Sequence, residues 1–185
     1  MKKFFLKMRD EYSLISEDIK DYVHFFGAIK NIFYTPYLHL SILLALFSVL
    51  LAPSTTYWTD LAIDIIPSML GFSLGGYAII IAFGDDKFRE FLATTKIENK
   101  SLFMIINATF IHFIMSQVIA LLLAILINIS GCSALWLNIA CCTATYYAIL
   151  FCLAVALEIK TISKWYVSHK VMQTQQSPLP SESNE

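Results

Sequence analysis

One stretch of the sequence decides the fold: residues Leu102–Ile129, LFMIINATFIHFIMSQVIALLLAILINI, which contain no Asp, Glu, Lys or Arg. A helix rises about 1.5 Å per residue, so about 20 apolar residues cross the hydrocarbon core of a bilayer. The apolar residues do not alternate with a period of two, which disfavours a strand of a membrane barrel. We therefore expect this stretch to span a membrane as a helix that is tilted or extends beyond the bilayer.

Three other apolar blocks have a comparable length, and they lie at residues 31–52, 65–83 and 134–159. They explain why the 185-residue chain is 57% hydrophobic and 15% charged, whereas a soluble domain is about 45–50% apolar and about 25% charged. With a formal net charge of -1, this composition excludes a soluble enzyme, a secreted disulfide scaffold and a nucleic-acid-binding module. We predict an all-α, polytopic membrane protein with four transmembrane helices, preceded by an N-terminal cytoplasmic amphipathic helix.

The predicted chain has three parts: the N-terminal helix (residues 1–30), the transmembrane domain (31–160) and a cytoplasmic membrane-proximal segment (161–185). The last part ends in the polar sequence QTQQSPLPSESNE, which we expect to be disordered from Gln173 onwards because it holds too few apolar residues to form a core.

The positive charges predict the orientation of the four spans. All 13 Lys and Arg residues lie before residue 31, between residues 87 and 100, or after residue 159, and the connections Pro53–Asp60 and Ser130–Ser133 contain none. Because cytoplasmic loops carry an excess of Lys and Arg, we expect the 84–101 loop and both termini in the cytoplasm. The predicted location is the cytoplasmic (inner) membrane, with several passes.

The N-terminal helix carries a narrow apolar stripe with steps of three and four residues, as in a coiled coil. Residues 10–21 hold five acidic side chains and one Lys, whereas helices that lie on a membrane usually carry a polar face rich in Lys and Arg. We therefore favour contact with a cytosolic partner protein or a second copy over a helix lying flat on lipid. The partner stripe consists of Met8, Tyr12, Ile15, Ile19, Tyr22 and Phe26.

The 84–101 loop is predicted to contain a short helix. Gly84 can end the preceding span, Asp85 or Asp86 can cap the short helix, and Ser101 can cap the next span. The apolar side of this short helix is expected to rest on the lipid headgroups.

The second predicted span carries a series of small residues, which is typical of a face where another helix backbone approaches closely. We interpret it as a helix-packing or oligomer seam, and the neighbouring helix can belong to the same chain or to another copy. The seam consists of Ser68, Gly71, Gly75, Gly76, Ala78 and Ala82.

Two carboxylates, Asp60 and Asp64, lie at the outer end of this span. They can offer a cation a ligand at the outer mouth of a bundle. The favoured alternative is that Asp64 caps the helix, with the helix starting at Ile65 and Pro67 in its first turn.

His112 is the ionisable residue deepest in the third span, and intramembrane ionisable residues usually face the interior of a bundle. We expect a neutral His112 hydrogen-bonded to a hydroxyl such as that of Tyr147 or Ser116, and a pore-lining or proton-sensing role is the alternative. The other intramembrane polar residues of this group are Ser116, Gln117, Asn138 and Thr145.

Catalysis is not expected. Residues Gly71–Gly75 spell G-x-S-x-G, but in hydrolases the serine of that motif sits on a sharp turn, whereas Ser73 lies in the middle of a span. An intramembrane hydrolase that pairs Ser73 with His112 is a remote alternative. The spacing of Cys and His residues predicts no metal site, and no cofactor is expected. A disulfide framework is not expected either, because most cysteines lie inside the fourth span.

The expected function is that of a non-catalytic, homo-oligomeric inner-membrane sensor, anchor or effector subunit that engages a cytosolic protein partner. It would contact membrane lipid and bind no nucleic acid directly. The main alternative is an oligomeric ion channel or membrane-depolarising pore, with Asp64 or His112 on the ion path.

In architecture over residues 31–160, and in its cytoplasmic surfaces at residues 1–30 and 84–101, the chain resembles the small membrane subunits of bacterial anti-phage defence systems, such as that of Kiwa. The resemblance implies an inner-membrane oligomer that works with a cytosolic effector in antiviral defence. It assigns no role to a particular residue.

Overall fold

A computed structural model describes residues 2–27, 29–51, 55–82 and 84–176, and nearly all of these residues are helical. The elements are α1 (Lys2–Phe26), α2 (Ile29–Tyr34), α3 (Pro36–Leu51), α4 (Thr55–Ala82), α5 (Asp86–Thr94), β1 (Lys96–Ile97), β2 (Lys100–Ser101), α6 (Leu102–Ser130) and α7 (Leu135–Gln176). The fold is therefore all-α, apart from a two-residue antiparallel hairpin whose turn contains Glu98 and Asn99 with positive φ.

Three helices are long and apolar enough to cross a membrane: the 57–82 part of α4, α6, and α7. α6 begins at the residue predicted for the third span and ends one residue later, and α7 begins one residue after the predicted start of the fourth.

The first predicted span, residues 31–52, is not one helix. The chain breaks at Thr35, where the hydroxyl and the backbone N–H both bind the carbonyl of Ile32, and α3 starts at Pro36. Proline has no N–H and disfavours the helical conformation in the residue before it, which explains the break. α3 has 16 residues and is therefore about 24 Å long.

The predicted cap at Asp64 is wrong, because α4 begins at Thr55 and runs through both Asp64 and Pro67. The turns before Asp64 are held by packing, since Trp58, Thr59 and Ala62 are buried. Burial of these side chains outweighs the local signal for a helix start at residue 65.

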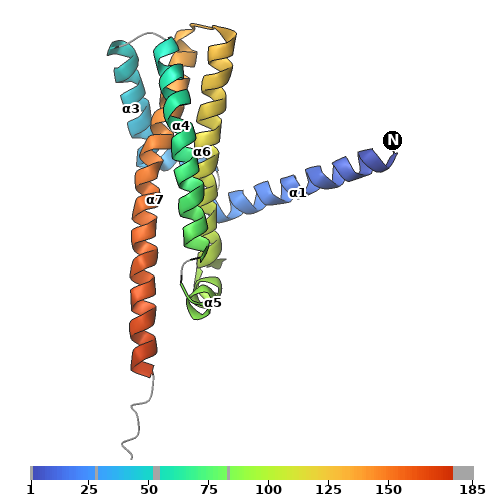
Figure 1. Ribbon diagram of the computed structural model, residues 1–185, viewed down its shortest axis with the longest axis vertical. Coiled ribbons are helices and arrows are strands. Elements are labelled where there is room, and N and C mark those ends of the chain that lie inside the picture. The colour runs from blue at the N-terminus through green and yellow to red at the C-terminus, as the bar shows by residue number, and fades with distance from the viewer. Residues whose placement is uncertain (1, 28, 52–54, 83, 177–185) are drawn as a thin grey trace, which may run out of the picture.

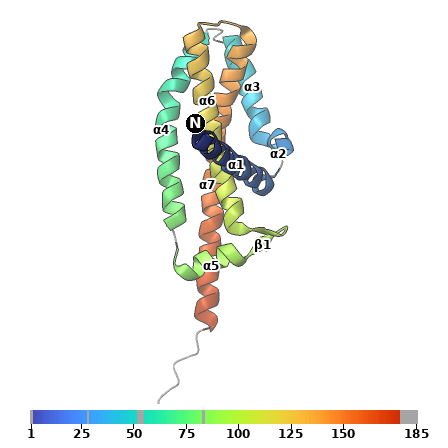
Figure 2. The ribbon, with the colours of Figure 1, turned by 90° about the vertical axis from the view of Figure 1, so that its right-hand side faces the viewer.

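The long helices form a bundle in which α6 packs on α4 and α7, while α3 packs on α7 (Figure 1). α1 does not run along this bundle. The C-terminal end of α1 crosses α6, and the rest of α1 projects sideways from the bundle (Figures 1 and 2).

The end of the bundle that carries the 84–101 loop also differs from the prediction. α7 continues as one helix to Gln176, so Gln173–Gln176 are helical and not disordered, and the predicted tail beyond them lies outside the described residues. The apolar side of α5 does not rest on lipid headgroups: Phe88 and Leu92 are buried in a core cluster with residues of α6 and α7.

Candidate functional site

The candidate site is centred on His112 of α6, which is 5% exposed. Its Nδ1 lies 2.5 Å from the hydroxyl of Tyr22 on α1, and its Nε2 lies 2.6 Å from the hydroxyl of Tyr147 on α7. The predicted bond to Tyr147 is therefore present, whereas Ser116 donates to the carbonyl of Phe113. One side chain thus joins three helices that are far apart in the sequence.

The two ring nitrogens are both occupied. In a neutral imidazole one nitrogen donates and the other accepts, so one tyrosine donates to the ring and the other accepts from it. The ring is also enclosed: Phe26 of α1 stacks on it at 4.1 Å between centroids, and Phe151 of α7 meets it edge-on at 4.7 Å. These contacts make His112 a junction between α1 and the bundle.

Tyr22 is the residue of α1 that forms a hydrogen bond with His112. Its burial against α6 raises the pKa of its hydroxyl above the usual value, so it stays neutral at physiological pH. A neutral hydroxyl can act both as donor and as acceptor toward His112. The hydrogen bond therefore persists in either tautomer of the ring.

A second polar contact joins α4 to α6. Gln117 is fully buried and donates from Nε2 to Ser73 Oγ at 2.9 Å, while Ser73 donates to the carbonyl of Met69 at 2.6 Å. Ser73 thus bonds to Gln117 and Met69, and His112 bonds to two tyrosines. The structure does not bring Ser73 and His112 together as an acid–base pair.

The remaining buried polar residues predicted in the spans, Asn138 and Thr145, lie on α7. Asn138 accepts a weak bond from Cys142, and Thr145 donates to the carbonyl of Cys141. Both residues are nearly inaccessible. They satisfy polar groups within α7 at the point where it packs in the bundle.

The small-residue seam of α4 faces away from the bundle. A Cβ added at Gly71, Gly75 or Gly76 would meet no atom of another described element within 4 Å, and Ser68, Ala78 and Ala82 are exposed. Asp60 and Asp64 are exposed as well. No described neighbour in the same chain covers the seam.

The predicted partner stripe divides into two parts. Tyr22 and Phe26 pack on His112. The other four residues are exposed, Tyr12 by 66%: Met8, Tyr12, Ile15 and Ile19. Ile15 and Ile19 border a groove between α1 and α6, whereas Met8 and Tyr12 lie farther along α1 toward its N-terminus.

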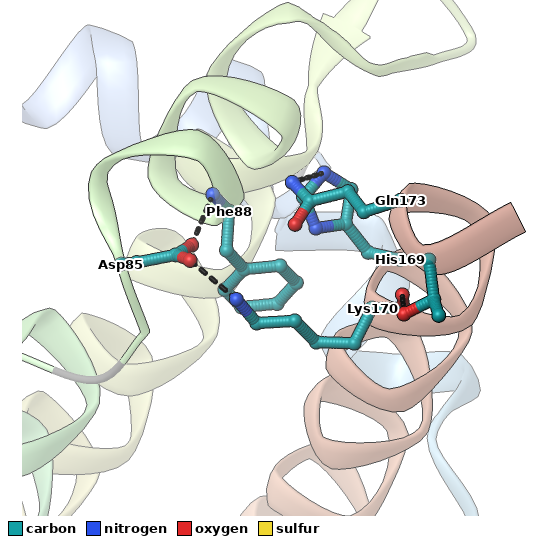
Figure 3. Close-up of polar contacts among 6 residues, drawn as sticks. Asp85, Phe88, His169, Lys170 and Gln173 are labelled. Atoms are coloured by element: carbon teal, nitrogen blue, oxygen red, sulfur yellow. Dashed lines mark hydrogen bonds and ion pairs between the residues drawn. The ribbon is translucent and has the colours of Figure 1, made fainter. Parts of the chain in front are cut away.

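A second junction, between α5 and α7, was not predicted (Figure 3). Asp85 caps α5 by accepting from the N–H of Phe88 at 2.9 Å, as expected, and its other oxygen binds Lys170 Nζ at 2.5 Å. The bond from Lys170 and the N–H of Phe88 hold the pKa of Asp85 below its usual value. Phe88 packs edge-on against Tyr166, with His169 beside it.

Gly84 allows the turn into α5. Its φ of +85° is one that side-chain-bearing residues avoid, and an added Cβ would lie 2.6 Å from a ring carbon of Phe88. Ser101 precedes α6 as expected but makes no capping bond, and its hydroxyl is 3.4 Å from the carbonyl of Leu92.

Among the residues that the structure describes, there is no group of three or more His, Cys, Asp or Glu side chains placed to hold a metal ion. The four cysteines are unpaired thiols, and Cys132 is the exposed one. The site thus consists of hydrogen bonds and aromatic contacts.

Its three long apolar helices place the chain in the class of helical membrane proteins. Comparisons with protein-family models, curated proteins and solved structures found no match to the chain.

Proposed function

We propose that this protein is a non-catalytic, homo-oligomeric subunit of a cytoplasmic membrane that binds a cytosolic protein through α1 and passes the binding event to its transmembrane bundle. The observation that carries the proposal is the His112 junction. It ties a helix that lies outside the bundle to two bundle helices through Tyr22 and Tyr147.

The proposed topology has four spans, with α3 as the fourth, and both termini in the cytoplasm. The distribution of Lys and Arg supports the orientation. α3 is short, but a short span is accommodated by local thinning of the bilayer at modest cost. His112 lies 16 residues from Asn128 near the other end of α6, which is about 24 Å along the helix. The junction is then close to the cytoplasmic boundary of the hydrocarbon core.

The outer part of α1 is the proposed binding surface. A helix of 25 residues is about 37 Å long, and only its C-terminal turns contact α6. Phe4, Met8 and Tyr12 are exposed on the rest of it, and the charged residues Lys7, Arg9, Asp10 and Glu11 lie among them. This mixture of apolar anchors and charges of both signs suits a partner with an apolar groove and a polar rim.

The α4 seam is the proposed contact between copies. Gly71 and Gly75 permit close approach of a second helix backbone, and no described helix of the same chain occupies that space. Phe72 is 82% exposed on a different side of the same helix and serves as a control position.

The test uses a photo-crosslinking amino acid at position 12 in the full-length protein in living cells. The proposal expects a covalent adduct with one cytosolic protein, which is lost with Met8→Glu and retained with Ser16→Glu. Adducts with lipid or with a second copy only would contradict it.

Oligomer size is measured in parallel by mass photometry in nanodiscs. Gly75→Leu should reduce the protein to monomers, whereas Phe72→Leu should not. The membrane potential of cells that express the protein tests the alternative function, an ion-conducting pore. If expression depolarises the cells and His112→Ala abolishes this depolarisation, the protein forms a pore.

A further inference from the structure

A groove of about 420 Å³ lies in the angle between α1 and α6. Its apolar lining includes Ile15, Ile19, Phe25, Ala108, Ile111 and Met115. Ile111 and Met115 are exposed by 40% and 48% although they belong to a candidate membrane span. An exposed apolar groove of this kind is filled in the membrane by lipid or by protein.

The charged residues that line the groove are both acidic. Asp18 and Asp21 border it from α1, and no Lys or Arg is among the described residues that line it. Two carboxylates repel an anionic headgroup and attract an ammonium group. The charge of the groove therefore selects among lipids.

The position of the groove fits a lipid that stands upright in the inner leaflet. Ala108 is 20 residues from Asn128 near the other end of α6, or about 30 Å, which is the thickness of the hydrocarbon core. Met115 then lies about 10 Å inside this core, at the depth of acyl chains. Met104, which also lines the groove, lies beyond the boundary, at the depth of headgroups.

The dimensions of the groove favour a narrow occupant. From Met104 to Met115 the groove follows α6 for about 17 Å. A helix is about 10 Å across, whereas a single acyl chain is narrower and lies more readily in the angle between two helices.

We infer that the α1–α6 groove binds a phospholipid with an aminated headgroup, such as phosphatidylethanolamine, with an acyl chain against Ile111 and Met115 and the ammonium group at Asp18 and Asp21. The inference rests on the proposed topology but not on the cytosolic partner.

The test uses the full-length protein in nanodiscs of equal parts phosphatidylethanolamine and phosphatidylglycerol. A trace of a photoactivatable analogue of one lipid is included, and the experiment is repeated with the analogue of the other lipid. Labelling of residues 104–115 is located by mass spectrometry. We expect the ethanolamine probe to label this segment about fivefold more than the glycerol probe, which corresponds to about 1 kcal/mol from two exposed charge contacts.

Two matched variants separate the groove from the general charge of α1. Asp18→Asn with Asp21→Asn should bring the labelling ratio close to one. Asp10→Asn with Glu17→Gln removes the same charge from the same helix outside the groove lining and should leave the ratio unchanged. A third variant, Ile111→Trp, should reduce labelling by both probes because the larger ring fills the groove.

Equal labelling by both probes in the unmodified protein would overturn the inference, as would a ratio that the Asp18/Asp21 variant leaves unchanged. Absence of labelling, together with disulfide-linked dimers of an Ile111→Cys variant, would show that a second copy occupies the groove. That result would overturn the lipid site and leave the proposed oligomer standing.

Discussion

Removing one hydroxyl group from α1 tests the junction at His112. Tyr22→Phe keeps the aromatic ring that stacks near Phe26 and His112 but removes the partner of Nδ1. A buried polar group left without a partner costs about 1–3 kcal/mol. Because Tyr22 is partly exposed, we expect a cost of about 1–2 kcal/mol, which favours release of α1 from α6 by about 5- to 30-fold.

The assay reads this release as the reactivity of a thiol beneath α1. Ala108 lines the groove and is 3% exposed, so Ala108→Cys reacts with a maleimide when α1 lifts away. In a Cys132→Ser background, peptide mass spectrometry assigns the modification to position 108. If release and rebinding are fast relative to modification, the rate is proportional to the released fraction.

Tyr12→Phe is the matched control, since it makes the same chemical change on the same helix at an exposed position. It should leave the reactivity at position 108 unchanged. The reasoning is refuted if Tyr22→Phe gives the same rate as Tyr12→Phe. It is also refuted if Tyr22→Phe equally raises the reactivity of the buried thiols of α7, because that pattern indicates opening of the whole bundle.

Three further predictions concern other contacts. Ser73→Ala should lower the free energy of unfolding by about 1–3 kcal/mol, because it leaves a buried amide of α6 without its partner, whereas Ser68→Ala should have little effect; both are measured by denaturant titration in mixed micelles. The Asp85–Lys170 ion pair should be retained near neutral pH, because the pKa of Asp85 is lowered in the folded state. The ion pair therefore stabilises the fold fully above the pKa of Asp85 in the unfolded chain, which is about 4. This stabilisation is lost as the pH falls through the lower pKa of the folded state. Proteolysis of the α5 segment at pH 3 and pH 7 checks this, and equal cleavage at both would contradict it. Gly84→Ala should increase the same cleavage at pH 7, because the added Cβ strains a backbone with φ of +85° and meets the neighbouring ring at 2.6 Å.

The sequence predicts the long helices best. The block at Leu102–Ser130 is uncharged and lies between a Ser and a Gly, so its length and its ends are both readable. The cap of α5 at Asp85 is local and was also predictable. Where two local signals compete, tertiary packing decides: Asp64 resembles a cap, but burial of Trp58 extends α4 beyond it.

The site could be predicted only in part. That His112 would bind Tyr147 follows from their similar depth on two adjacent spans. Its second partner, Tyr22, is 90 residues away, on a helix whose path across the bundle depends on the chain turns near Gly27 and Thr35. The stripe indicated that Tyr22 is buried against something, but its period does not say against which helix. Likewise, Lys170 could not be assigned to Asp85, because the fourth span was predicted only to residue 159 and the sequence does not show how far its helix continues.

The arrangement of bonds on α6 determines what a movement of α1 can change. Asn107 and Gln117 bind α4 through Tyr77 and Ser73, and they are 10 residues, or about 15 Å, apart on either side of His112. Two such bonds hold α4 and α6 as one unit.

α7 has a different attachment. The side chains of His112 and Tyr147 form a hydrogen bond between α6 and α7. Much of that interface is apolar packing between residues such as Phe113 and Phe151, which tolerates sliding better than a hydrogen bond does. When Tyr22 leaves His112, the ring is free to turn, and the bond to Tyr147 is the one that changes. α7 should then shift relative to the α4–α6 pair, and because Lys170 is on the same continuous helix, the shift should reach α5. Tyr147→Phe should therefore increase proteolysis of the α5 segment, while Tyr146→Phe, which removes a bond to Ser48 of α3, should not. If both variants leave α5 equally protected, the junction anchors α1 without transmitting its movement.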